Sequence, residues 1–266
     1  MNLFNDHFQN FKSYQIPKAQ LIIADIPYNI GINAYGSNPA WYIDGDNKNG
    51  ESKLAGTEFF DTDKDFKPAE FMHFCSKMLK KEPKAKGQAP AMLIFCGFEQ
   101  QFYLIELAKK YGLNNYINII FRKNFSAQVL KANMRIVGNA EYGLIFYREK
   151  LPKFNNNGKM VFNIFDYEKD QNVRKIHPTQ KPIKLLKKII EIFTDEGDVV
   201  IDPVAGSGTT LIAAIELGRK AYGFEIKKNF YKEATEFINE TIQRKSDIAE
   251  YGYAKEEINK SYPTLF

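Results

Sequence analysis

Short apolar runs without polar alternation are the feature of this sequence that most limits its fold. Residues 21–24 and 199–201 are rich in branched side chains, and residues 91–97 form a similar run. Such continuous runs are typical of parallel strands that helices cover on both faces. Helical patterns alternate with these strands along the chain, most clearly over residues 182–194. The sequence therefore predicts an α/β fold with a mostly parallel sheet in three layers.

The other elements are predicted from apolar spacing and from residues that start or stop helices. A helix begins at Pro68 and another ends at Gly112. The further predicted elements are strands at 116–123 and 141–148, a helix at 211–217, and a long helix from 227 to about 245 with a charged tail. The segments 31–68 and 151–176 are polar and irregular, so we expect them to carry specificity.

The composition and charge of the chain argue against several classes of protein. The 266 residues include 37 Lys and Arg against 32 Asp and Glu, a net charge of +5 that suits a polyanionic partner or an ordinary, mildly basic protein. Cys75 and Cys96 lack C-x-x-C spacing, so we expect neither a disulfide framework nor a metal site. No signal peptide pattern and no membrane-length apolar window is seen, so we expect a cytoplasmic protein with no membrane partner.

A glycine-containing turn, "DPVAGSGTT" at 202–210, joins a predicted strand to a predicted helix. Gly206 and Gly208 allow a ligand to approach the backbone, and the helix start presents unpaired N–H groups. Glu225 ends the next strand, where an acid is placed to accept hydrogen bonds from two ribose hydroxyls. The turn lacks the Gly-Lys-Ser/Thr of a Walker loop. A dinucleotide site, weakened by Leu211, and a turn without ligand stay open on this motif alone.

A second motif, "ADIPY" at 24–28, follows the first apolar run. Its position is the carboxyl end of a strand, where open α/β sheets bind their ligands. Taken alone, it predicts only a strand end and a proline turn.

Together, "ADIPY", "HPTQKP" at 177–182 and "DPVAGSGTT" resemble the amino DNA methyltransferases of the β group, whose catalytic motif, target-recognition region and cofactor motif follow in that order. The resemblance extends from about residue 20 to residue 240. It implies a Rossmann-like methyltransferase fold, three-layer αβα with a mainly parallel seven-stranded sheet. It also implies S-adenosyl-L-methionine as cofactor and double-stranded DNA as substrate. We expect a single domain, 1–266, with inserted DNA-facing segments at about 31–67 and 124–176.

The resemblance also assigns the cofactor-binding residues, which fall in all three motifs and at the end of the strand after the glycine turn. They are Ala24, Asp25, His177, Pro178, Thr179, Gln180, Lys181, Pro182, Asp202, Pro203, Ala205, Gly206, Ser207, Gly208, Thr209, Thr210 and Glu225. His177 is expected to form a wall of the pocket rather than to act as a general base.

The catalytic residues implied are Asp25, Ile26, Pro27 and Tyr28. The amino nitrogen of a base is a poor nucleophile because its lone pair is delocalised into the ring. The Asp25 carboxylate and the Ile26 carbonyl would accept its two N–H bonds and stabilise the charge that develops. Pro27 would keep Ile26 extended, and Tyr28 would stack on the flipped base.

Several alternatives stay open at this stage. Ile26 stands where the family most often has its first proline, which keeps a non-catalytic nucleic-acid-binding relative in view. Asp25 favours N6-methyladenine over N4-methylcytosine, because the cytosine enzymes often begin this motif with Ser. Methylation of RNA or protein is a third candidate. Both cysteines follow Phe rather than Pro, which argues against a 5-methylcytosine enzyme.

Partners other than DNA are less defined. A homodimer and a separate cognate restriction nuclease both remain open. Trp41 is a candidate to insert into DNA or stack on a base. Packing of Trp41 under the loop is favoured at least as much. Seven basic residues are candidates to contact phosphates or base edges, although each one singly is better explained as a solvated surface residue. They are Lys123, Lys131, Arg135, Lys153, Lys159, Arg174 and Lys175.

Overall fold

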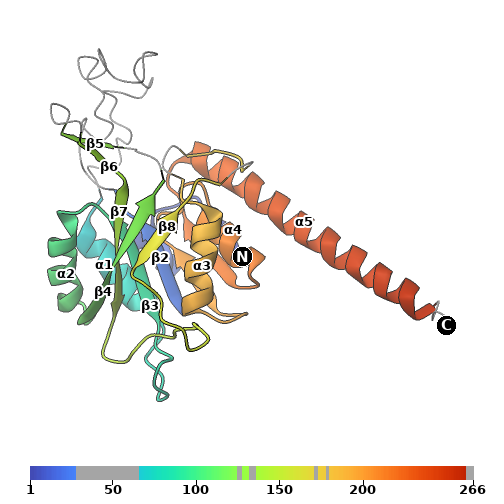
Figure 1. The fold of residues 1–266 in the computed structure, drawn as a ribbon, viewed down its shortest axis with the longest axis horizontal. Coiled ribbons are helices and arrows are strands. Elements are labelled where there is room, and N and C mark those ends of the chain that lie inside the picture. Colours follow the sequence, from blue (N-terminus) through green and yellow to red (C-terminus); the bar gives the residue numbers. More distant parts are fainter. Residues whose placement is uncertain (28–65, 125–127, 132–135, 171–172, 178–179, 262–266) are drawn as a thin grey trace, which may run out of the picture.

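A mixed sheet of eight strands forms the centre of the protein (Figure 1). This computed structural model describes residues 1–27, 66–124, 128–131, 136–170, 173–177 and 180–261. The strands are β1 (Asn2–Phe4), β2 (Leu21–Asp25), β3 (Ala91–Cys96), β4 (Asn115–Lys123), β7 (Ala140–Tyr147), β8 (Ile164–Tyr167), β9 (Val199–Asp202) and β10 (Lys220–Phe224). Their order is β1-β10-β9-β2-β3-β7-β4-β8, and only β7 runs antiparallel to its neighbours.

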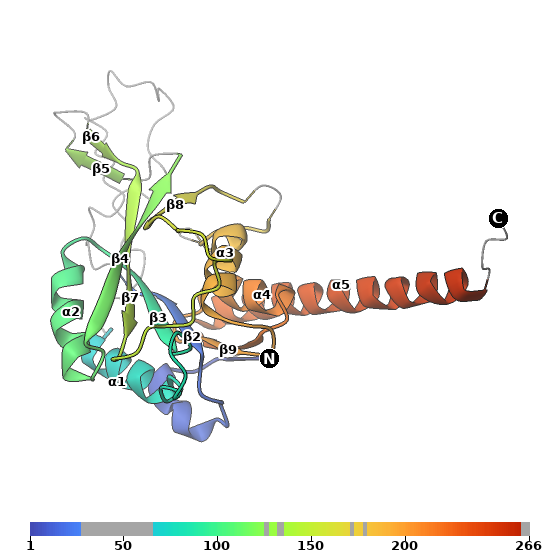
Figure 2. The same cartoon turned by 60° about the horizontal axis from the view of Figure 1, so that its bottom comes forward.

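Helices cover both faces of this sheet (Figures 1 and 2). The helices on one face are α1 (Pro68–Met78) and α2 (Gln100–Lys110), and those on the other are α3 (Ile183–Phe193), α4 (Thr209–Glu216) and the inner part of α5 (Lys228–Ser261). A short 3-10 helix, η1 (Phe8–Ser13), packs beside α1. Alternate residues of β2 enter the two cores, Ile23 towards α3 and α4 and Ile22 towards α1. The predicted three-layer αβα fold is confirmed.

The sheet has eight strands rather than the expected seven. β1 has only three residues, too few to show a pattern in the sequence, and pairs with β10. β8 lies inside the segment 151–176, which was predicted to be irregular. Its residues alternate between exposed and buried at the edge of the sheet, so it lacks the continuous apolar run that marks β2 and β9.

The second predicted DNA-facing segment, 124–176, is partly sheet. β7 pairs with both β3 and β4 in the main sheet. A separate ribbon of β5 (Gln128–Lys131) and β6 (Ile136–Gly138) lies beyond the carboxyl end of β4 (Figure 1). That edge of the sheet is also the one where β2 ends, since β2 and β4 run in the same direction. Most of the first segment, 31–67, including Trp41, lies outside the described residues.

The last helix is longer than predicted. α5 continues to Ser261 instead of ending near residue 245, and its outer part projects away from the domain (Figure 2). Residues 246–261 contain no proline and are rich in Ala, Glu and Lys, which favour helix. Residues 242–247 are exposed, so apolar periodicity ends there and no longer marks the helix, which explains the short prediction. Across the described part of the chain, no helix combines the length and apolar character needed to cross a membrane.

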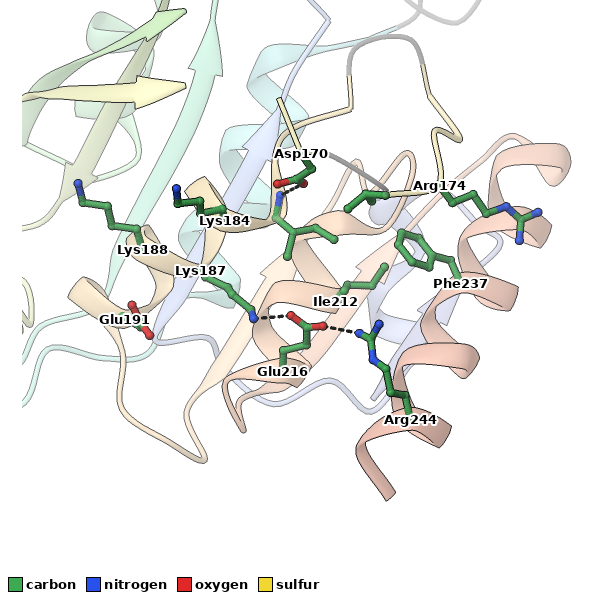
Figure 3. Close-up of a pocket in the computed structure, with 12 residues that line it drawn as sticks. Asp170, Arg174, Lys184, Lys187, Lys188, Glu191, Ile212, Glu216, Phe237 and Arg244 are labelled. Carbon is green, nitrogen blue, oxygen red and sulfur yellow. Dashed lines mark hydrogen bonds and ion pairs between the residues drawn. The ribbon is translucent and has the colours of Figure 1, made fainter. Parts of the chain in front are cut away.

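A groove of about 580 Å³ lies on the outer side of α3 and α5 (Figure 3). Its basic side chains are largely matched by acids. Glu216 accepts from Lys187 at 2.5 Å and from Arg244 at 2.6 Å, as Figure 3 shows. None of the predicted catalytic or cofactor-binding residues lines this groove, and of the candidate DNA contacts only Arg174 does, so we assign it no role in the predicted chemistry.

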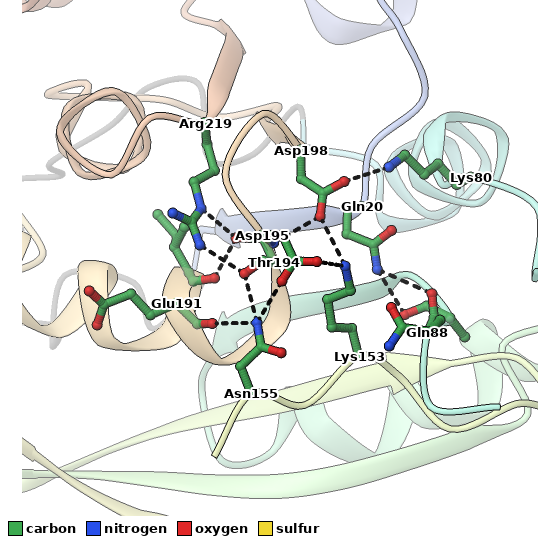
Figure 4. Close-up of polar contacts among 12 residues, drawn as sticks. Gln20, Lys80, Gln88, Lys153, Asn155, Glu191, Thr194, Asp195, Asp198 and Arg219 are labelled. Atoms are coloured by element: carbon green, nitrogen blue, oxygen red, sulfur yellow. Dashed lines mark hydrogen bonds and ion pairs between the residues drawn. The ribbon is translucent and has the colours of Figure 1, made fainter. Parts of the chain in front are cut away.

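Lys153 anchors the polar segment after β7 to the turn between α3 and β9 (Figure 4). Its ammonium pairs with Asp195 and lies 3.5 Å from Asp198, and its side chain is only 10% exposed. Asp198 also accepts from Lys80 at 2.7 Å. This network lies at the amino ends of β2 and β9, the edge opposite Asp25. Lys153 is therefore neither solvated nor at the edge of the sheet where Asp25 lies.

Replacing Lys153 by methionine should lower the free energy of unfolding by about 1–3 kcal/mol, because Asp198 loses a partner in a largely buried site; the half-exposed Asp195 limits the loss. Urea unfolding followed by circular dichroism measures the change. The control is Lys81→Met at an exposed lysine. Equal stability of the two variants would show that Lys153 does not anchor this segment.

Candidate active site

A cavity of about 360 Å³ opens at the carboxyl ends of β2 and β9. These strands are parallel neighbours, with Ile22 opposite Ile201, so the residues that follow them meet at one edge. All three sequence motifs contribute to the wall. The predicted site residues that line it are Asp25, Pro27, His177, Gln180, Lys181, Asp202, Pro203, Ala205, Gly206, Ser207, Thr209, Thr210 and Glu225.

Other predicted site residues do not line this cavity. The side chains of Ala24 and Ile26 are buried in the core on the α1 face. Pro182 is the N-cap of α3, and Gly208 faces α5. Tyr28, Pro178 and Thr179 lie outside the described residues. Because the role proposed for Ile26 belongs to its carbonyl, burial of its side chain does not exclude that role.

The two glycines of the turn have different surroundings. Gly206 has φ +51°, and a Cβ built on it would approach His177 Cδ2 at 3.9 Å, across the cavity wall. Gly208 has φ +75° at the N-cap of α4, and its Cβ would lie 3.1 Å from Ile238 Cδ1 and 3.2 Å from Ala234 Cβ. Gly206 therefore keeps space beside His177, whereas Gly208 allows α5 to pack closely. The prediction that both approach a ligand is corrected for Gly208.

Glu225 braces the glycine turn from β10. Its Oε2 accepts the Gly206 N–H at 2.9 Å, and its Oε1 accepts the Lys227 N–H at 2.7 Å. Burial raises the pKa of Glu225 above its ordinary value, although these hydrogen bonds oppose the shift. A carboxylate has about four acceptor positions, so two backbone bonds leave capacity for ligand hydroxyls.

Asp202 lies deeper, at the end of β9. Burial raises the pKa of Asp202 to about 7, although hydrogen bonds from the Thr210 side chain and from the Val204 N–H, the latter at 3.0 Å, lower it. Its side chain is therefore partly protonated near neutral pH, and it adds less negative charge to the cavity than its residue type suggests.

The described residues of the "HPTQKP" segment that form the opposite wall are His177, Gln180 and Lys181. The His177 ring lies 4.7 Å from the Phe230 ring between centroids. Burial, with the nearby Lys181 and Lys227, lowers the pKa of His177 to about 4, so it is neutral at pH 7. Gln180 fastens its own loop, accepting the Ile176 N–H and donating to the Arg174 carbonyl, both at 3.0 Å.

Lys181 makes the contact that sequence reasoning did not anticipate. Its Nζ lies 2.6 Å from Asp25 Oδ2 and 3.4 Å from Glu141 Oε2. The Lys123 ammonium pairs with the other oxygen of Glu141 and is 9% exposed, so it is neither solvated nor placed as a surface DNA contact. Glu141 was missed altogether. The one feature of the sequence that could have pointed to Glu141 is an acidic residue at the start of an otherwise apolar strand.

Gln100 and several aromatic residues were also missed. Gln100 Nε2 donates to the Pro27 carbonyl at 2.8 Å, while its Oε1 accepts the Gly97 N–H at 2.9 Å. The first turn of α2 therefore holds the backbone that follows Asp25. Phe8 and Phe230 complete the cavity wall from η1 and α5. Among the described residues, no cluster of His, Cys, Asp and Glu is placed to hold a metal ion.

A family model described as DNA methylase, for N6 and N4 enzymes, matches residues 19–236. The chain belongs to this DNA methylase family. DNA adenine methyltransferase YhdJ of Escherichia coli (strain K12) is 28% identical, over 97% of this chain and 86% of its own length. Type II methyltransferase M2.DpnII of Streptococcus pneumoniae is 40% identical over 34% of each chain. The resemblance inferred from the motifs is confirmed.

Solved structures support the same fold. The crystal structure of the M1.HpyAVI–SAM complex superposes with a TM-score of 0.64 at 21% identity, covering 90% of this chain and 98% of the other. PvuII DNA methyltransferase (cytosine-N4-specific) gives 0.60 at 15% identity, covering 91% and 92%. As a member of this family, the chain is placed among the amino DNA methyltransferases that use S-adenosyl-L-methionine.

Gly208→Ala should destabilise this DNA methylase by about 1–3 kcal/mol more than Gly87→Ala. Both glycines have positive φ, +75° and +65°, but only at Gly208 would the added methyl meet neighbours, Ile238 and Ala234. Thermal or urea unfolding of both variants isolates the packing cost. Equal losses would contradict the packing role assigned to Gly208.

Proposed function

We propose that this DNA methylase transfers a methyl group from S-adenosyl-L-methionine to the N6 amino group of adenine in double-stranded DNA. The observation that carries the proposal is that Asp25 lines the same cavity as Gly206 and Glu225. Adenine is favoured by Asp25 at the start of the catalytic motif, and by the name of YhdJ, a DNA adenine methyltransferase that is similar over nearly the whole chain.

The cavity suits this cofactor. Glu225 offers carboxylate oxygens for two ribose hydroxyls, and the turn at Gly206 offers backbone without a side chain. The rings of Phe8 and Phe230 and the neutral His177 supply apolar and aromatic wall for the remaining parts. When bound, the cofactor supplies an electrophilic methyl group, and the protein needs to provide no metal and no covalent nucleophile.

The target base requires two acceptors in a dry pocket. In this proposal, Asp25 accepts one N–H of the amino group and the Ile26 carbonyl accepts the other. Ile26 lacks the fixed φ of proline, but its N–H donates to the Phe95 carbonyl at 3.3 Å, which continues the strand pairing past Asp25. Gln100 holds the next carbonyl, that of Pro27. These contacts support a functional acceptor pair despite the missing first proline.

N4-methylation of cytosine is the second candidate, because an exocyclic amino group presents the same two N–H donors in both bases. A non-catalytic nucleic-acid-binding protein is the third, motivated by Ile26. Methylation of RNA or protein is tested by competition between DNA, RNA and peptide acceptors for the labelled methyl group. The proposal places the protein in the cytoplasm, on DNA, either alone or with a separate restriction nuclease. M2.DpnII, similar over a third of the chain, is a type II methyltransferase.

Incubation with labelled S-adenosyl-L-methionine and duplex DNA of mixed sequence, followed by digestion to nucleosides, should yield N6-methyladenine. Asp25→Ala should slow turnover about 10²- to 10³-fold, the usual effect of removing one preorganised polar contact to a reacting group, when turnover is measured at saturating cofactor.

The matched control is Glu106→Ala, at an exposed carboxylate on α2 outside the segments expected to face DNA, which should retain activity. N4-methylcytosine among the nucleosides would establish the second candidate. Cofactor binding without any methylated base, or an Asp25→Ala variant as active as the wild type, would refute the proposed catalysis.

A further inference from the structure

Two acids and two lysines form a mostly buried row beside the cavity. Lys181 Nζ lies between Asp25, at 2.6 Å, and Glu141, at 3.4 Å, and Lys123 pairs with the far oxygen of Glu141. The side chains of Lys181, Lys123 and Glu141 are 6%, 9% and 13% exposed, so each charge depends on its neighbours for stabilisation. The formal charges of the row sum to zero.

The row is assembled from separate elements at one edge of the sheet. Asp25 ends β2, Lys123 ends β4, and Glu141 lies near the start of β7, which runs antiparallel between β3 and β4. Lys181 comes from the loop before α3. Aromatic rings support both cations, with Lys181 Nζ 5.0 Å from the centroid of Phe95 and Lys123 Nζ 5.2 Å from that of Tyr167.

The contact between Lys181 and Asp25 opposes the proposed reaction. Methyl transfer places positive charge on the amino nitrogen, and the Asp25 carboxylate is the group that would stabilise it. An ammonium 2.6 Å from that carboxylate neutralises part of its charge and repels the positive charge that develops on the base. Moving Lys181 towards a second anion would weaken both effects.

We infer that Glu141 is a positioning residue that draws the Lys181 ammonium away from Asp25 as the target base arrives. This inference rests on the proposed function. Glu141 Oε2 is already within ion-pair distance of Lys181, so rotation of the lysine stem suffices and no backbone movement is needed. Lys123 stays on the other oxygen and keeps Glu141 charged.

The electrostatics of Glu141 agree with this role. Burial raises the pKa of its carboxyl, but the nearby Lys181 and Lys123 outweigh burial and hold that pKa below its ordinary value. Glu141 is therefore an anion at neutral pH and an acceptor for either lysine.

Glu141→Gln keeps the shape of the side chain and removes its charge. We expect kcat to fall about 10- to 100-fold, as for the loss of one charge-assisted hydrogen bond, because Lys181 then remains on Asp25. The KM for DNA and the Kd for S-adenosyl-L-methionine should change by less than about 3-fold, since neither ligand contacts Glu141 in this scheme. The control is Glu106→Gln, at an exposed carboxylate on α2 outside the segments expected to face DNA.

The double variant Glu141→Gln with Lys123→Met separates positioning from charge balance. It restores a neutral row, so we expect its Tm to return towards the wild-type value while kcat stays low, because residue 141 still offers Lys181 no negative charge. Wild-type kcat in the double variant would show that Glu141 only balances charge, and wild-type kcat in the single variant would overturn the inference directly. If the unmodified protein methylates no base, the proposed function itself is wrong. If the unmodified protein is active and the single variant is equally active, only the role of Glu141 is wrong.

Discussion

The parallel pairing of β2 with β9 is the constraint on which the rest of the site depends. Leu21 lies opposite Val200 and Ile22 opposite Ile201, and all four side chains are buried. Because the strands run in the same direction, their carboxyl ends share an edge. Asp25 and the turn after Asp202 consequently meet although they are far apart in the chain. β10 pairs on the other side of β9 and brings Glu225 to the same edge.

The segment at 177–182 connects the two halves of this site. His177 lies opposite Gly206 and against Phe230, on the side where we propose that the cofactor binds. Lys181, four residues later, reaches Asp25 on the side proposed for the base. Gln180 lies next to Lys181 and bonds to the backbone of Ile176 and Arg174, so it holds the chain that enters this segment.

Sequence patterns predicted the central elements well because burial leaves a direct trace in composition. β2, β3 and β9 are continuous apolar runs, and α3 shows a clean helical stripe. β1 and β8 were missed because they are short or half exposed at the edges of the sheet. The outer part of α5 was missed because the apolar period of the helix ends at the exposed residues 242–247.

For the site, the motifs identified which segments meet, but not how their side chains pair. The ion pair of Lys181 with Asp25, the burial of Lys123 and the packing of α5 on Gly208 all depend on residues distant in sequence. No local pattern encodes such partners. Cavity walls from η1 and α5, such as Phe8 and Phe230, were invisible for the same reason.

The most direct test is a crystal structure of the protein with S-adenosyl-L-homocysteine, the product form of the cofactor. We predict that its ribose hydroxyls lie within about 3 Å of the Glu225 carboxylate, with the sulfur directed towards Asp25. A ligand bound elsewhere, such as the groove beside α3, or a sulfur facing away from Asp25, would contradict the juxtaposition that we place at the centre of this protein's chemistry.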